Sequence, residues 1–239
     1  MKIIKLDTIG STNSFLKDLS AQEEIASGTC VVANTQNAGR GQRGNTWFFE
    51  PNKSLACSVF VRFSGVESTQ QFEVLIASTW AVYKLLKTLQ IPHLKIKWPN
   101  DILSDSKKIC GILVETSTKG NFITQAVIGV GLNVNNTVFP ELPQASSMFL
   151  ASKRTFNLDT LTQALCDQII SCCSQVNTGL SFKTKYESVL FKKDKVQVFE
   201  INNTLVNGII RGITNTGELC LETAQDLRSY PVKAIRMHF

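Results

Sequence analysis

The sequence predicts an α+β protein, with strands and helices in mixed α/β order through most of the chain and a small β-barrel at its C-terminal end. Three observations predict this fold. Apolar residues recur at every third or fourth position over 72–90 and 158–176, which is typical of amphipathic helices. Short apolar runs bounded by turn residues separate these segments, as expected of strands. After Phe191 only short alternating runs remain, so we expect one domain over 1–190 and a second over 191–239.

The first domain begins with a strand and a short helix. Residues 2–6 are mainly apolar and predict the strand. Ser11 and Thr12 are helix-capping residues, and the apolar positions that follow fall on one face of a helix. Further strands are expected over 29–35, 54–63 and 94–98. The helix over 72–90 ends at Ile91-Pro92, because proline cannot continue a helix.

A pair of long strands is expected next. The runs I-C-G-I-L-V-E-T (109–116) and F-I-T-Q-A-V-I-G-V-G-L-N-V (122–134) flank T-K-G-N, which is typical of a hairpin turn. Helices over 158–176 and 180–190 complete the first domain. In the second domain, turn residues at 202–203 and 215–217 separate strands that start at Lys195, which indicates a small β-barrel.

Composition and charge argue against several classes of protein. Hydrophobic residues make up 43% of the 239 positions, enough for a substantial core, so disorder is not expected. The net charge of +6 is shared by both domains rather than gathered in a stripe, and it gives no argument for nucleic-acid binding. No apolar run approaches the roughly 20 residues of a membrane span. The charged N-terminus M-K-I-I-K-L-D does not resemble a secretion signal.

The cysteines and histidines favour a reduced interior without a zinc site. The seven cysteines form no C-x-x-C pair and several lie in apolar runs, so we expect free thiols in a cytoplasmic protein. The only two histidines, His93 and His238, lie far from each other and from any cysteine pair, which disfavours zinc.

The segment 33–47, A-N-T-Q-N-A-G-R-G-Q-R-G-N-T-W, is the most informative stretch of the chain. Glycine lets the backbone approach a ligand closely and present consecutive N–H groups to it. Arginine adds a fixed charge and a planar set of donors that suits phosphate or carboxylate. The segment therefore predicts a mobile loop over an anionic ligand, and an ordinary glycine-rich surface loop is the alternative.

Two polar motifs lie at the ends of predicted elements. Ser11, Thr12 and Asn13 could hydrogen-bond a polar head group, or they could serve only as a helix cap. In K-W-P-N-D, Pro99 breaks a strand and leaves Asn100 and Asp101 at its end, where α/β enzymes place catalytic groups. Asp101 could hold a magnesium ion or bind a polarised hydroxyl, and a simple Asn-Asp turn is the alternative.

Glycines mark the two paired strands as a ligand surface. Lys107 and Lys108 enter an apolar strand that contains Gly111, and a glycine within a strand often marks a ligand or backbone that approaches closely. A solvated lysine pair is the commoner interpretation of Lys107-Lys108 taken alone. The run I-G-V-G-L-N keeps one face of the second strand bare. It is not a G-x-G-x-x-G followed by a helix, so a dinucleotide-binding fold is disfavoured.

The order and spacing of these motifs closely resemble the biotin–protein ligase family. The resemblance rests on S-T-N-S-F-L, G-R-G-Q-R-G-N-T-W, K-W-P-N-D, K-K-I-C-G-I-L-V-E and I-G-V-G-L-N-V-N, and it covers essentially the whole chain. It implies a mixed sheet with flanking helices, like those of class II synthetases and biotin–lipoate ligases, and a C-terminal barrel of the Src-homology-3 kind. The two parts would be a catalytic domain over 1–190 and a β-barrel domain over 191–239.

The resemblance also implies the reaction. Biotin and MgATP would give biotinyl-5'-AMP and pyrophosphate. A lysine of a biotin carboxyl carrier domain of a carboxylase would then attack the adenylate, take the biotin as an amide and release AMP. ATP and Mg²⁺ are the implied cofactors, biotin is the substrate and the carrier domain is the partner. The ATP would carry the magnesium, so no metal ligand is assigned among the side chains.

Site residues follow from the family motifs position by position. The resemblance implies that Lys108, Arg40 and Asp101 are catalytic. Lys108 is assigned rather than Lys107 because it stands three residues before the glycine. The biotin-binding positions are Ser11, Thr12, Asn13, Gln36, Gly39, Arg40, Gly41, Trp47, Lys108 and Gly111. The positions that would bind ATP or the adenylate are Arg40, Arg43, Trp47, Asn100, Lys108 and Asn133.

The sequence departs from the family pattern in its loop. Gln42 stands where the common bacterial pattern has a second arginine, which lowers the charge available to hold the adenylate, and no role is assigned to it. Some family members carry an N-terminal DNA-binding domain, whereas this chain enters the catalytic pattern at Ser11, so we expect no DNA binding. An exposed sheet edge would allow a homodimer.

Two other functions remain as alternatives. Lipoate–protein ligases share the fold and the adenylate chemistry, although K-W-P-N-D and the β-rich C-terminal segment argue against that substrate. A non-catalytic biotin-sensing or carrier-binding module would be expected to lack Lys108 or Arg40, and both are present.

Overall fold

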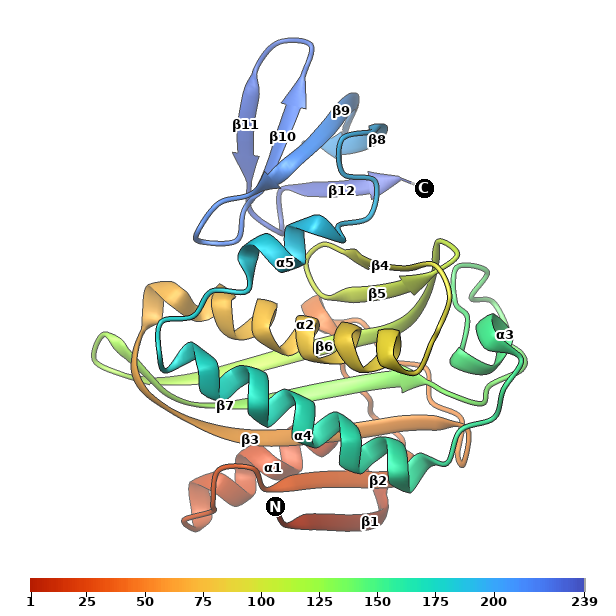
Figure 1. Cartoon of the computed structure of the whole chain (residues 1–239), viewed down its shortest axis with the longest axis vertical. Coiled ribbons are helices and arrows are strands. Elements are labelled where there is room, and N and C mark those ends of the chain that lie inside the picture. The colour runs from red at the N-terminus through yellow and green to blue at the C-terminus, as the bar shows by residue number, and fades with distance from the viewer. Residues whose placement is uncertain (239) are drawn as a thin grey trace.

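The computed structural model describes residues 1–238, apart from the side chain of Arg43, and contains two β-sheets stacked along its long axis (Figure 1). The larger sheet has seven strands in the order β1-β2-β3-β7-β6-β5-β4. Its first two strands are parallel and the other neighbours are antiparallel, so the sheet is mixed, as expected. The strands are β1 (Ile3–Ile9), β2 (Cys30–Gln36), β3 (Ser54–Glu67), β4 (Leu94–Lys97), β5 (Asp101–Ser104), β6 (Lys107–Lys119) and β7 (Phe122–Asn133).

Helices cover the two faces of this sheet. The long helices α2 and α4 lie side by side across one face, and α1 lies on the other (Figure 1). The core divides accordingly: Leu16 of α1 packs with Val31 and Phe60, while the neighbouring Cys30 and Val59 face the opposite cluster. The helices are α1 (Thr12–Gln22), α2 (Gln71–Thr88), α3 (Met148–Ser152), α4 (Leu158–Val176) and α5 (Lys183–Ser188), with 3₁₀ turns at Gln42–Gly44 and Ser68–Gln70.

The C-terminal segment forms a separate antiparallel sheet, in the order β11-β10-β9-β8-β12. Its strands are β8 (Val196–Ile201), β9 (Thr204–Ile213), β10 (Leu219–Thr223), β11 (Leu227–Tyr230) and β12 (Ile235–His238). Within the described residues β11 and β12 end this order, so the pairing defines a sheet, and closure into a barrel stays a prediction. The domain boundary at residue 190 likewise stays a prediction.

The small sheet is fastened to the turn between β4 and β5. The indole Nε1 of Trp98 donates to the carbonyl of Gly217 at 2.9 Å, and Phe72 packs so closely on this glycine that a Cβ there would lie 2.0 Å from the ring. The hydroxyl of Tyr186 donates to the carbonyl of Pro99 at 2.9 Å. Full burial raises the pKa of the Tyr186 phenol well above its usual value, so this donor keeps its proton. These bonds hold the K-W-P-N-D turn from both sides.

Some predicted elements differ in extent. The strand expected to end at residue 63 continues to Glu67, and the helix expected over 180–190 is confined to Lys183–Ser188. Strand β5 was not expected, because only Ile102 and Leu103 carry its apolar pattern and its pairing with β4 is a long-range property. Helix α3, a single turn capped by Ser147, was also missed.

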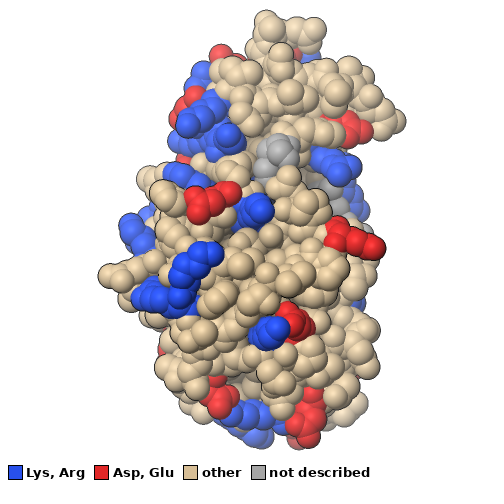
Figure 2. All heavy atoms as spheres, turned by 90° about the vertical axis from the view of Figure 1, so that its right-hand side faces the viewer, with Lys and Arg blue, Asp and Glu red and all other residues tan. Residues whose placement is uncertain are grey.

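The state of the cysteines and the distribution of surface charge can be compared with the expectations from composition. All seven cysteines are free thiols and six are buried, and burial raises the pKa of Cys173 to about 12. On the face shown in Figure 2, lysine and arginine side chains lie in several separate groups with acidic residues between them. No helix among residues 1–238 is long and apolar enough to cross a membrane.

Candidate active site

A surface of glycines on β6 and β7 forms the floor of the site. Gly111 and Gly131 are directly opposite each other in the register of the two strands. The indole of Trp47 lies on them: a Cβ on Gly131 would come 2.4 Å from its Cε2 atom, and one on Gly111 would come 3.2 Å from its Cζ3 atom. A Cβ on Gly129 would lie 2.2 Å from Oδ1 of Asn13. A Cβ would therefore clash at Gly129 and Gly131, whereas at Gly111 it would make only tight contacts.

The cavity beside Trp47 is small. Its volume is about 50 Å³, whereas ligand pockets typically measure about 300–1,000 Å³. The glycines of β7 were expected to keep one face of that strand bare, and in the structure the indole of Trp47 lies on this face at Gly131. Trp47, together with Arg40 and Gly41, forms the side of this cavity that belongs to the loop.

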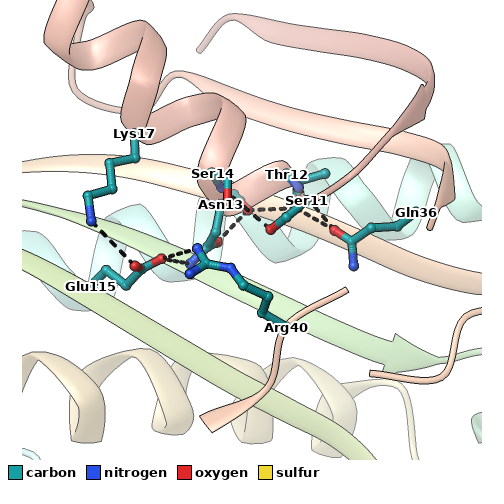
Figure 3. A network of polar contacts seen from close by, with 9 residues as sticks. Ser11, Thr12, Asn13, Ser14, Lys17, Gln36, Arg40 and Glu115 are labelled. Atoms are coloured by element: carbon teal, nitrogen blue, oxygen red, sulfur yellow. Dashed lines mark hydrogen bonds and ion pairs between the residues drawn. The ribbon is translucent and has the colours of Figure 1, made fainter. Parts of the chain in front are cut away.

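A chain of hydrogen bonds leads from the head of α1 to β6 (Figure 3). Ser11 is the N-cap of α1, and Gln36 Oε1 accepts from the Thr12 backbone N–H at 3.0 Å. Ser58 Oγ, on β3, lies 2.8 Å from Thr12 Oγ1 and 2.6 Å from Asn13 Oδ1. The structure confirms the helix cap at Ser11, and binding of a polar head group by the same residues stays a prediction.

Glu115 ends this chain and was given no role from the sequence. Its carboxylate accepts from Asn13 Nδ2 at 3.0 Å and from an Arg40 guanidinium nitrogen at 3.2 Å, and Lys17 Nζ lies 3.6 Å away (Figure 3). Its position four residues after Gly111 was the available signal, because alternate residues of a strand share one face. Arg40 is thus held by an acidic side chain of the sheet.

Lys108 lies at the centre of the site. Its Nζ is 2.6 Å from Asp101 Oδ1 and 5.4 Å from the centre of the Trp47 ring. A register shift between β5 and β6, of the kind often found beside active sites, separates the two pairs Asp101–Gly111 and Leu103–Lys108. The neighbouring Lys107 is exposed, whereas Lys108 is partly buried and its ammonium lies beside Gly111 and Trp47.

Asn100 and Asp101 lie where β5 begins, rather than at the free end of a strand. The Asn100 Nδ2 atom donates to the carbonyl of Ile112 at 2.7 Å, which anchors the turn to β6. The backbone of Asp101 is paired with Lys97 of β4, and its side-chain carboxylate is directed to Lys108. The turn between β4 and β5 thus positions the Asp101 carboxylate beside Lys108.

A cationic cleft of about 520 Å³ lies between the two sheets, and sequence reasoning missed part of it. Lys97, Lys108 and Arg236 line it together with Asp101. Burial lowers the pKa of the Lys97 ammonium, and the charges of Lys108 and Arg236 lower it further, against the opposing effect of Asp101. Arg236 comes from β12 of the C-terminal sheet, where no motif pointed to it.

An apolar pocket of about 370 Å³ lies on the other side of Lys108. Phe48 and Phe139, whose ring centres are 5.9 Å apart in an edge-to-face arrangement, line it with Leu142 and Pro143. Asn133 lies at its base: its Nδ2 donates to the Ser146 carbonyl at 2.9 Å, while its buried Oδ1 has no hydrogen-bond partner in the described structure. All three cavities share Trp47 and Lys108.

Most of the predicted site residues therefore lie together. The first cavity is lined by Ser11, Thr12, Asn13, Gln36, Arg40, Gly41, Trp47, Asn100, Lys108 and Gly111. Gly39 packs behind it, where a Cβ would lie 2.6 Å from Nε2 of Gln36. Asp101 lines the cleft and Asn133 the apolar pocket. The predicted contact of the Arg43 side chain lies outside the described residues.

This arrangement defines a class of protein. Three cavities that meet at one lysine, beside an arginine-bearing glycine loop, can bring a carboxylate, a nucleotide base and a polyphosphate together, which is what a nucleotide-dependent ligase requires. The chain belongs to the biotin/lipoate A/B protein ligase family, whose model matches residues 6–133.

Similar proteins agree with this assignment. The chain is 30% identical over 222 residues to the bifunctional ligase/repressor BirA of Escherichia coli, an alignment that covers 91% of this chain and 68% of that protein. It is 30% identical over 220 residues to the biotin–[acetyl-CoA-carboxylase] ligase of Mycobacterium tuberculosis, covering 89% and 80%. The biotin protein ligase of Aquifex aeolicus, solved with biotin and ATP, has the same fold, with a TM-score of 0.81, 21% identity and coverage of 99% and 98%.

Proposed function

We propose that this chain activates biotin with MgATP to form biotinyl-5'-AMP and transfers the biotin to a lysine in the biotin carboxyl carrier domain of a carboxylase. It is an ATP-dependent biotin–protein ligase, in keeping with its family and with relatives that are named for this activity on a carboxylase. The observation that carries the proposal is the position of Lys108, where the three cavities meet.

The polar chain at the head of α1 suits the ureido ring of biotin. That ring offers one carbonyl acceptor and two N–H donors, so its site needs both donors and acceptors. Gln36 Oε1 is engaged by Thr12, which leaves the Nε2 group of Gln36 as a donor, and the hydroxyls of Thr12 and Ser11 can accept. Beyond the ring, the valeryl chain would run over the glycine surface toward Lys108.

The apolar pocket and the cleft suit the nucleotide. Aromatic and aliphatic side chains at Phe48, Phe139 and Leu142 would contact the adenine, while Lys108 would stabilise the charge on the reacting carboxylate and on the α-phosphate. Lys97 and Arg236 would contact the more distant phosphates. No group of three or more His, Cys, Asp or Glu side chains that could hold a metal lies within the described residues. The magnesium would arrive with ATP. The unpartnered Oδ1 of Asn133 is an oxygen of the kind Mg²⁺ prefers.

Asp101 suits the transfer step. Its carboxylate lies 2.6 Å from Lys108 and faces the cleft, through which an acceptor lysine would enter. A carboxylate there would orient the incoming ammonium and take up its proton as the amine attacks the acyl group of the adenylate. The amide bond forms as the acyl–phosphate bond breaks, and AMP leaves.

Isotope exchange between ATP and pyrophosphate tests the first half-reaction. We expect exchange that depends on biotin, and no exchange with lipoate or octanoate. Transfer of labelled biotin to a purified carrier domain, with a variant in which the acceptor lysine is replaced by arginine as the control, tests the second. Exchange with lipoate alone would overturn the proposal and favour a lipoate ligase.

The variant Arg236→Gln tests the role of the C-terminal sheet in ATP binding. We expect the KM for ATP to rise roughly tenfold, corresponding to about 1.4 kcal/mol, because one charge-assisted contact to phosphate is lost. The KM for biotin should stay unchanged. Arg228→Gln is the matched control, since it removes the same charge from β11, where Arg228 is largely exposed and paired with Asp226. A KM for ATP equal to that of the wild type would remove Arg236 from the proposed site.

A further inference from the structure

We propose that Glu115 is a positioning residue, which sets the hydrogen-bond direction of the biotin-ring site and holds Arg40 of the loop over it. The inference rests on the proposed biotin-ligase function and assigns a residue to which no role has so far been given. Glu115 touches neither of the reacting atoms, and it acts through Asn13 and Arg40.

The contacts of Glu115 join three parts of the site. One oxygen of its carboxylate, Oε2, receives both Asn13 Nδ2 at 3.0 Å and Arg40 at 3.2 Å (Figure 3). The side chain is 22% exposed, which makes these bonds stronger than those of a fully solvated carboxylate. The carboxylate therefore connects the head of α1 to the glycine-rich loop through the sheet.

A carboxylate that can only accept hydrogen bonds fixes the direction of the polar chain. Because Glu115 accepts, Asn13 has to present its NH₂ group to it and its Oδ1 to Ser58. Oδ1 cannot donate, so the single hydroxyl proton of Ser58 points to Asn13, at 2.6 Å. Ser58 then has no proton left for Thr12 Oγ1, 2.8 Å away, so the proton of Thr12 goes either to Ser58 Oγ or to Gln36 Oε1, which lies 3.3 Å away.

This direction matters for the ligand. With its proton taken up by Ser58 or Gln36, the Thr12 hydroxyl presents a lone pair to the cavity, and this lone pair can accept from a ring N–H. Gln36 keeps its Oε1 on the Thr12 backbone N–H and presents its NH₂ group as a donor. Acceptor and donor are thus set before the ligand arrives, which lowers the cost of binding a ring that has both N–H and C=O groups.

The variant Glu115→Gln removes this control with little change in shape. A glutamine amide can donate as well as accept, so Asn13 could turn over and the chain of protons could run in either direction. It also removes the negative charge that holds Arg40. We expect the KM for biotin in ATP–pyrophosphate exchange to rise about tenfold, with kcat changed by less than about threefold and the KM for ATP unchanged. Biotin should also be found on bystander proteins, because the loop is held less firmly.

Ser58→Ala and the double variant Glu115→Gln/Ser58→Ala distinguish a role of Glu115 through the hydrogen-bond chain from a general effect on structure. If Glu115 acts through Ser58, the KM of the double variant should match that of the more impaired single variant. Two unconnected contributions would instead multiply. Glu24→Gln, at an exposed ion pair with Arg62, is the charge-matched control and should leave all constants unchanged.

Each outcome decides the question. A Glu115→Gln enzyme with the biotin KM of the wild type, or effects that multiply in the double variant, would overturn the inference while biotin-dependent exchange by the wild type still supports the proposed function. If Glu115→Gln does not fold, Glu115→Asp replaces it. Aspartate keeps an acceptor-only group, so the biotin KM should stay within about threefold of wild type, and a tenfold rise would contradict the inference. Absence of biotin-dependent exchange by the wild type would instead reject the proposed function.

Discussion

Replacing Lys108 with alanine should abolish the formation of the adenylate. Lys108 is the cation common to all three cavities, and its ammonium would stabilise the charge that develops on the carboxylate and the α-phosphate. Removing one such preorganised group typically costs about 10²–10³-fold in rate. We expect Lys108→Ala to lose at least this much biotin-dependent ATP–pyrophosphate exchange. Exchange at the wild-type rate would show that the lysine has been wrongly assigned.

Lys107→Ala is the matched control for this prediction. Lys107 is the preceding residue on the same strand, but it is exposed, so its loss should leave exchange unchanged. Lys108→Ala also leaves Asp101, which is 17% exposed, without its ion-pair partner. We therefore expect a modest drop in melting temperature, and circular dichroism should show that the fold is retained.

The long elements of the fold could be predicted because their patterns are local. Apolar residues at helical spacing located α2 and α4, and the hairpin of β6 and β7 was indicated by its turn and by two long apolar runs. Strand β5 could not be found in this way, because four residues carry too little pattern and the strand exists through its pairing with β4 and β6. The stacking of the C-terminal sheet on the Trp98–Pro99 turn is likewise a long-range contact that no local signal describes.

The site residues likewise fall into those found in local motifs and those placed by long-range contacts. The family motifs are short and local, so Lys108, Asp101 and the polar residues at the head of α1 could be chosen from the sequence by resemblance, and the structure brings them together. Glu115 and Arg236 acquire a place in the site only through partners more than 70 residues away or on the other sheet. The position of Trp47 also depends on the fold, since its ring lies where two strands both present glycine.

Replacing Arg40 with glycine should release the adenylate rather than prevent its formation. The loop is fastened to the sheet by the contact of Arg40 with Glu115 and by a short bridge in which the Trp47 N–H donates to the Gly39 carbonyl at 3.0 Å. Glycine removes the side-chain contact and adds backbone freedom. Gln42 cannot supply the missing charge. We expect the variant to biotinylate exposed lysines of an added bystander protein, such as serum albumin, many times faster than the wild type.

The comparison between Arg40→Gly and Lys108→Ala separates retention from chemistry. A loop that only retains the intermediate predicts that Arg40→Gly keeps measurable ATP–pyrophosphate exchange while it loses carrier selectivity. Lys108→Ala should lose both exchange and labelling, because no adenylate forms. Strict labelling of the carrier domain by Arg40→Gly would mean that the loop does not retain the adenylate, and that Arg40 contributes to the first step alone. Since Glu115 holds Arg40, Glu115→Gln should show the same loss of selectivity in milder form, with the arginine still present to contact the phosphate.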